Sequence, residues 1–130
     1  LMNEPPADKR LPEFIRYVSE RIPETSTLIT TNGTYLTEDR VHAYIDAGLK
    51  RIKVSLQSLD NESNRALMGY DADKVIANVI AARRIIKERR AKHVDLRVSM
   101  LVTTINGREI DQARRFWRRH GVRLVTSALE

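Results

Sequence analysis

The sequence predicts an α/β fold in which parallel strands alternate with helices as part of a barrel. Short β-prone segments alternate along the chain with segments whose apolar residues recur at helical spacing. Three polar motifs stand where strand-like segments stop, namely Asn3-Glu4-Pro5, Thr30-Thr31-Asn32-Gly33 and Val54-Ser55-Leu56-Gln57. Because ligands of parallel sheets and barrels bind at the carboxyl ends of the strands, we expect these motifs to share one functional rim.

The chain of 130 residues is too short for a complete barrel. An eight-unit (β/α) barrel of the TIM type needs about 250 residues, so we expect a partial barrel with parallel strands, a fragment of a larger one. The expected single domain spans residues 1–130. Lys53, Arg97 and Ser99 interrupt otherwise apolar strands, which indicates that one face of the sheet lines a ligand cavity.

The first half of the chain predicts alternating strands and helices. They follow in this order: a strand ending near residue 2, a helix at 12–21, a strand at 27–31, a helix after Thr37, and a strand at 51–56. Leu11, Phe14 and Ile15 belong to the apolar stripe of the first helix, at helical spacing. Thr37 is a good N-cap for the second helix, and Gly48 suits its end.

The second half continues the alternation. The expected elements are a short helix at 61–68, a long helix at 73–90, a strand at 95–102, a helix ending near residue 120, and a strand at 122–125. Val75, Val79 and Ile86 mark the apolar stripe of the long helix. Phe116 and Trp117 fall on the apolar side of the last helix, so we expect both in the core.

Net charge is +6, from 23 basic and 17 acidic residues. The basic residues gather in the two predicted C-terminal helices, in the runs 83–84, 87–90 and 114–119. Our first interpretation is a solvated outer face; a phosphate-binding surface for nucleic acid is the alternative. No apolar run approaches the ~20 residues of a membrane span. The absence of cysteine excludes a disulfide and agrees with a cytoplasmic protein. We expect no membrane partner and do not favour nucleic acid as one.

The side chains of the strand-end motifs suit a small polar ligand. The carboxylate of Glu4 could hold an ammonium group, and Ser55 and Gln57 share one strand face because side chains two apart point the same way. Asn-Gly is also a common turn pair, so each motif alone has an ordinary structural explanation. Taken together, the motifs favour a site for a ligand with an amine, a carboxylate, a ribose and a base.

Other chemistries find no support in the sequence. His42, His93 and His120 lack the spacing of metal ligands, so no metal site is predicted. Ser55 has no partner that suggests a nucleophile, and no glycine-rich phosphate loop or dinucleotide fingerprint is present. We therefore assign no catalytic residue.

The series of motifs resembles the core of the radical S-adenosylmethionine (SAM) enzymes. The family's Gly-Glu-Pro segment is similar to residues 1–5, its Thr-Asn-Gly turn to residues 28–36, and its ribose-binding strand to residues 52–57. The segment 103–109 also fits the pattern. The resemblance covers nearly the whole chain. It extends to family members that carry a C-terminal auxiliary-cluster domain of the SPASM or twitch type.

One departure from the family concerns its cysteines. The family's Cys-x-x-x-Cys-x-x-Cys motif ligates a 4Fe–4S cluster through thiolates, and this chain has no cysteine. Either the chain is a fragment whose cysteine loop and C-terminal region lie outside it, which we favour, or the family interpretation is wrong. A cluster-free relative that binds a nucleoside is a further alternative.

The resemblance implies a set of cofactor-binding residues: Asn3, Glu4, Asn32, Ser55, Gln57, Arg97, Ser99 and Thr103. Glu4 and its neighbours would bind the methionyl ammonium, and Asn32 would support the rim. Ser55 and Gln57 would contact the ribose or the methionyl carboxylate. The end of the strand at 95–102, up to residue 103, would supply contacts to adenine.

The resemblance also implies roles inside the barrel and an activity. Arg97 and Ser99 would point into the lumen, towards the carboxylate or the substrate. With a 4Fe–4S cluster held by residues outside this chain, the enzyme would cleave SAM to a 5′-deoxyadenosyl radical. That radical would abstract hydrogen from a peptide or small-molecule substrate. The expected partners are that substrate and a reductant such as flavodoxin or ferredoxin.

Overall fold

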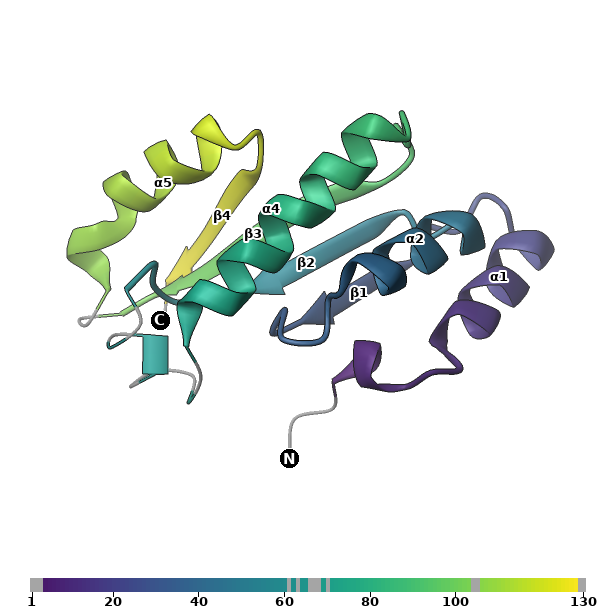
Figure 1. Ribbon diagram of the computed structural model, residues 1–130, viewed down its shortest axis with the longest axis horizontal. Helices are drawn as coiled ribbons and strands as arrows, with labels where there is room; N and C mark the ends of the chain where they lie inside the picture. The colour runs from purple at the N-terminus through teal and green to yellow at the C-terminus, as the bar shows by residue number, and fades with distance from the viewer. Residues whose placement is uncertain are drawn as a thin grey trace.

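Four parallel strands form one sheet in the computed structural model, which describes residues 4–60, 62, 64–65, 69, 71–103 and 106–128 (Figure 1). In sequence order they are β1 (Leu28–Thr31), β2 (Arg51–Ser55), β3 (Asp95–Val102) and β4 (Arg123–Ala128). Their order in the sheet is also β1-β2-β3-β4. Each of the first three strands is therefore connected to the next by a crossover, the connection of a (β/α) barrel.

Helices lie along one face of this sheet (Figure 1). They are α1 (Leu11–Arg21), α2 (Glu38–Ala47), α4 (Ala72–Glu88) and α5 (Ile110–Arg119), with short 3₁₀ turns η1 (Pro5–Ala7) and η2 (Gly107–Glu109). Alternate strand residues such as Ile29, Val54 and Val98 are buried against these helices. The other alternate positions face away from them, and we call this side of the sheet the open face.

The sequence predicted the fold class correctly: the chain is a partial α/β barrel of the TIM type with parallel strands. Local signals explain the helix boundaries. The Thr37 hydroxyl accepts the backbone N–H of Arg40 at 3.4 Å as the N-cap of α2. Gly48 ends the same helix in the left-handed region, with φ +92°. The helix expected at 61–68 and the strand expected near residue 2 lie mostly or wholly outside the described residues.

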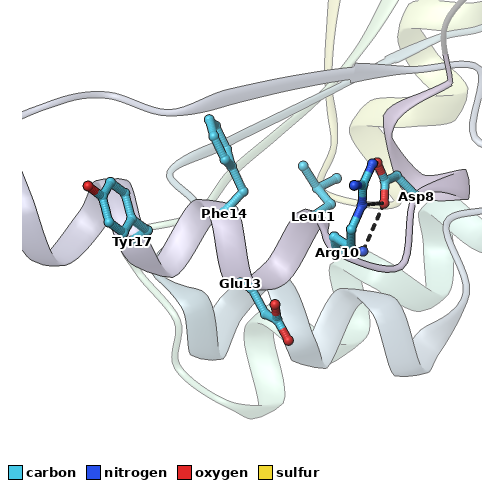
Figure 2. Close-up of a pocket in the computed structure, with 6 residues that line it drawn as sticks. All are labelled: Asp8, Arg10, Leu11, Glu13, Phe14 and Tyr17. Atoms are coloured by element: carbon cyan, nitrogen blue, oxygen red, sulfur yellow. Dashed lines mark hydrogen bonds and ion pairs between the residues drawn. The ribbon is translucent and has the colours of Figure 1, made fainter.

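The last strand and the first helix differ from the sequence prediction. The last strand is longer than the expected 122–125, because β4 pairs with β3 as far as Val102 and Ala128. Phe14, expected on the apolar stripe of α1, is 67% exposed. Figure 2 shows Phe14 and Tyr17 projecting from α1 beside a shallow hollow that is also lined by Asp8, Arg10, Leu11 and Glu13. Ile15 is the one α1 residue that is fully buried.

The core lies between the helices and the sheet. Trp117 and Tyr44 are its largest fully buried side chains, so the expectation for Trp117 is confirmed. Phe116 is only partly buried and packs edge-on against Trp117, with ring centroids 5.0 Å apart. Among the described residues, no helix is long and apolar enough to cross a membrane.

Candidate functional site

Glu4 lies at the carboxyl end of β1, although it precedes α1 in the chain. Its carboxylate accepts the backbone N–H of Asn32 at 3.1 Å and also the hydroxyl of Thr31. Thr31 is the last residue of β1 and is 2% exposed, while Glu4 itself is half-buried. The carboxylate is thus fixed at the strand end by one hydroxyl and one amide, and no cation among the described residues forms an ion pair with it.

The turn after β1 is held by its own polar groups. The side-chain oxygen of Asn32 accepts the backbone N–H of Thr34 at 2.9 Å and its hydroxyl at 2.7 Å. Asn78 of α4 donates to the carbonyl of Gly33 at 2.8 Å. Gly33 has φ +86°, and a Cβ there would lie 2.7 Å from Val75 and 2.9 Å from Val54. The Asn32 side chain therefore shapes the rim, and only glycine fits the next position.

Ser55 and Ser99 face each other at the same end of the sheet. Ser55 is the last residue of β2, and the strand register pairs it with Ser99 of β3. Both are half-buried on the open face, and the backbone N–H of Leu56 donates to the carbonyl of Ser99 at 3.0 Å. Two hydroxyls thus stand side by side next to the rim.

Gln57 joins the ends of β2 and β3. Its side-chain oxygen accepts the backbone N–H of Leu101 at 2.7 Å, and its own backbone N–H donates to Asn64 at 3.1 Å. The carboxamide oxygen is therefore bound within the protein, and the contact of Gln57 with the ribose or carboxylate stays a prediction. Leu101, half-buried beside it, offers an apolar surface.

Asn106 is a rim residue that the sequence prediction missed. It is 0% exposed, and its amide nitrogen donates to the carbonyl of Gln57 at 2.8 Å and to that of Leu101 at 2.9 Å. Its side-chain oxygen accepts the backbone N–H of Thr103 at 2.8 Å. The signal was present in the sequence, because Asn106 starts a second Asn-Gly pair just after a strand. Thr103 is thereby fixed next to Gln57.

Arg97 is the predicted site residue that lies farthest from the strand ends. It faces the open side two residues before Ser99, about 7 Å lower in the sheet at strand rise. Its guanidinium is bonded to Asp95, with Nη2 2.7 Å from the carboxylate. The register aligns it with Lys53 of β2 and Arg123 of β4. We call Lys53, Arg97 and Arg123 the cation row.

Tyr44 of α2 lies in the core, 1% exposed. Burial raises the pKa of its phenol to about 12; the charge of Arg40 lowers the pKa, and that of Glu4 raises it. The phenol therefore stays neutral at physiological pH.

The residues present fit one of the two groups that the family resemblance implies and not the other. A fixed carboxylate, paired hydroxyls and an apolar strand end at one rim fit the ammonium, ribose and base of SAM. The described residues contain no cluster of three or more His, Cys, Asp or Glu able to hold a metal ion. The chain has no cysteine, so its own residues do not supply the thiolates of a 4Fe–4S cluster. Asn3 lies outside the described residues.

The sequence is similar to a known family and to characterised relatives. The model of the radical SAM superfamily matches residues 1–117. GTP 3′,8-cyclase 1 of Mycobacterium tuberculosis is 43% identical over 83 residues, which are 60% of this chain and 23% of that protein. GTP 3′,8-cyclase of Aquifex aeolicus is 33% identical over 126 residues, 93% of this chain and 36% of that protein. The chain therefore spans about a quarter to a third of the relatives it matches.

Solved structures share the fold. Streptococcus suis SuiB bound to S-adenosylmethionine superposes with a TM-score of 0.78 at 19% identity, over 98% of this chain and 28% of that one. A domain of pyruvate-formate lyase-activating enzyme from Bacteroides vulgatus gives 0.60 at 8% identity, over 98% of this chain and 96% of that one. The family match over most of the chain decides the classification: this protein belongs to the radical SAM superfamily, whose enzymes use SAM and a 4Fe–4S cluster.

Proposed function

We propose that this chain is the SAM-binding part of a radical SAM enzyme that acts on GTP or a closely related nucleoside triphosphate. The relatives named GTP 3′,8-cyclase support the substrate class. When bound, SAM with a reduced cluster supplies a 5′-deoxyadenosyl radical for hydrogen abstraction. The cluster ligands belong to residues outside this chain, and the electron donor is a reductant such as flavodoxin or ferredoxin. The proposed compartment is the cytoplasm.

The rim residues would bind and orient the cofactor. Glu4, fixed by Thr31 and Asn32, would accept the ammonium of the methionyl group. Ser55 and Ser99 would offer hydroxyls to the ribose or the carboxylate. The end of β3, tied down by Gln57 and Asn106, would form the surface against which adenine packs.

The cation row is the observation that carries the substrate proposal. Lys53, Arg97 and Arg123 stand in register on three adjacent strands, about 4.8 Å apart from one strand to the next. Like charges directly opposite each other destabilise a sheet. Asp95 bonds to Arg97, and within the described part of the chain no ion pair joins Lys53 or Arg123 to a carboxylate. A triphosphate lying on the open face below the rim would neutralise this row.

Equilibrium binding to the intact protein tests this proposal. Replacing Arg97 and Arg123 together by Gln should weaken GTP binding by tenfold or more, since each charge-assisted contact contributes about 1.5–3 kcal/mol. Binding of guanosine, which lacks the phosphates, should change little, and SAM affinity should persist. The matched control replaces Arg115 and Arg119, both exposed on α5, by Gln. Unchanged GTP affinity in the Arg97 and Arg123 variant would contradict binding of the triphosphate on the open face.

Turnover distinguishes the nucleotide from a peptide. Anaerobically reconstituted intact protein should form 5′-deoxyadenosine when GTP is present. The structure of SuiB has been solved with a precursor peptide, so peptides are the competing substrate class. Formation of 5′-deoxyadenosine that depends on a peptide and not on GTP would assign the enzyme to peptide modification.

A further inference from the structure

A basic groove lies between α4 and the turn that joins α5 to β4. It has a volume of about 890 Å³. Its cationic lining consists of Arg83, Arg84, Lys87, Arg90, Arg118 and Arg119. Of the described residues that line it, Glu88 is the single acid. A concave surface with this charge ratio favours an anionic partner.

Most of these cations are not neutralised within the protein. Arg84 is the exception, with Glu38 at 2.7 Å and Glu88 at 3.5 Å. The side chains of the other five make no ion pair or hydrogen bond with any residue that the structure describes. Arg83 and Lys87 stand one turn apart on α4, where like charges repel. The groove therefore concentrates positive charge without local compensation.

The helix dipole accounts for only part of this arrangement. Lys87 lies in the last turn of α4, and Arg118 in the last turn of α5, where cations are favourable by about 0.3–1 kcal/mol each. The helix dipole does not require the cations of α4 and those of α5 to lie next to each other. The cations of the two helices meet where the turn at Gly121, with φ +70°, lies beside Arg83: a Cβ at Gly121 would be 3.3 Å from Nε of Arg83.

The basic groove lies away from the cofactor rim. Gly121 lies two residues before the start of β4, so the groove flanks the amino ends of the strands, whereas Ser55 and Gln57 mark their carboxyl ends. Figure 1 shows the C-terminal ends of α4 and α5 on the side where β4 begins. A partner held there would contact the outside of the domain and leave the rim open.

We propose that the basic groove docks an acidic, amphipathic segment of a partner protein. Among the described lining residues, the half-buried Ile80 of α4 is the aliphatic side chain that stands between these cations. Ile80 suits contact with a leucine-like side chain, and the guanidinium forks around it suit carboxylates.

Nucleic acid fits the basic groove less well. Single strands are held by stacking on aromatic rings, and His120 is the one ring among the described lining residues. Its ring packs against Phe116, with centroids 4.7 Å apart. A sugar–phosphate backbone would also leave Ile80 without an apolar partner.

The test measures binding of a labelled synthetic peptide, with Glu and Leu at helical spacing, to the intact protein. A peptide with Gln in place of every Glu and a DNA duplex serve as comparison probes. Replacing Arg118 and Arg119 together by Gln should weaken binding of the acidic peptide about tenfold at low salt. The matched variant replaces Arg16 and Arg21, exposed on α1, and should bind the acidic peptide as the wild type does. SAM and GTP affinities should stay unchanged in both variants.

Three outcomes would overturn the proposal. The first is no binding of the acidic peptide, or equally tight binding of its neutral counterpart. The second is an equal loss of acidic-peptide affinity in the α1 variant, which would show that the peptide responds to the net charge of the protein and not to the groove. The third is tighter binding of the duplex with the same sensitivity to Arg118 and Arg119, which would assign the basic groove to nucleic acid. Thermal unfolding of each variant confirms that these exposed substitutions leave the fold intact.

Discussion

The backbone N–H of Asn32 donates to the carboxylate of Glu4 at 3.1 Å, across 28 residues of sequence. This bond links the segment before α1 to the turn after β1, and the hydroxyl of Thr31 bonds to the same carboxylate. The contact places a half-buried carboxylate at the rim, and within the part of the chain that the structure describes no cation pairs with it. A charge held in this way is suited to an ammonium group from outside.

Replacing Glu4 by Gln should weaken SAM binding by roughly ten- to hundredfold in the intact enzyme, because a charge-assisted hydrogen bond is worth about 1.5–3 kcal/mol. Isothermal titration with SAM measures the change. The control is Glu13→Gln on the exposed face of α1, which should bind SAM normally. An undiminished SAM affinity in Glu4→Gln would exclude Glu4 from the cofactor site.

Replacing Gly33 by Ala should destabilise the protein by about 2–5 kcal/mol, the sum of backbone strain and overpacking. The strain arises because φ is +86°, and the overpacking because the new methyl would press on Val75 and Val54. Gly69→Ala separates the two effects, since φ is +84° there and nothing lies within 4 Å of the added Cβ. Urea denaturation should therefore show a clearly smaller loss for Gly69→Ala. Equal losses of stability in the two variants would mean that the contact of the new methyl with Val75 of α4 does not contribute to the destabilisation.

Replacing Asn106 by Ala should lower stability by about 2–4 kcal/mol, because it leaves buried backbone groups of the rim without partners. These are the carbonyls of Gln57 and Leu101 and the N–H of Thr103. Hydrogen exchange should show faster amide exchange at Leu101 and Thr103 than in the wild type. Gln112→Ala, at an exposed position on the adjacent helix, is the control. Unchanged amide exchange at the ends of β2 and β3 would contradict the role of Asn106 in linking these two strand ends.

Stability should fall in alkali through Tyr44. Its folded-state pKa is about 12, above the ordinary value of 10.0, because burial disfavours the phenolate. Between these values the unfolded chain releases the proton while the folded protein retains it, so stability decreases as pH rises. Linkage gives a loss of about 1.4 kcal/mol at pH 11. The difference in unfolding free energy between Tyr44→Phe and the wild type should shift in favour of Phe by that amount between pH 9 and pH 11. A constant difference would contradict the shift.

Much of the fold was predictable because its signals are local. Thr37 and Gly48 bracket α2 as their capping preferences require, and Asp95–Val102 has the expected bounds. The rim prediction rested on motifs at strand ends, and the structure brings Glu4, Asn32, Ser55 and Gln57 to the same end of the sheet. Whether these residues hold the cofactor stays a prediction. Phe14 escaped prediction because helical spacing identifies an apolar stripe but not the surface that covers it.

The sequence by itself determined the alternation of strands and helices, the turn at Gly33 and the family, since these depend on neighbouring residues and short motifs. The tertiary structure alone decided which distant residues meet. Strand register aligned Lys53, Arg97 and Arg123. Helix packing placed Arg83 of α4 beside Gly121, which follows α5. Burial made Asn106 the link between two strand ends. The physical reason is that register and helix packing are set by the whole core, whereas periodicity reports only the face on which a residue lies.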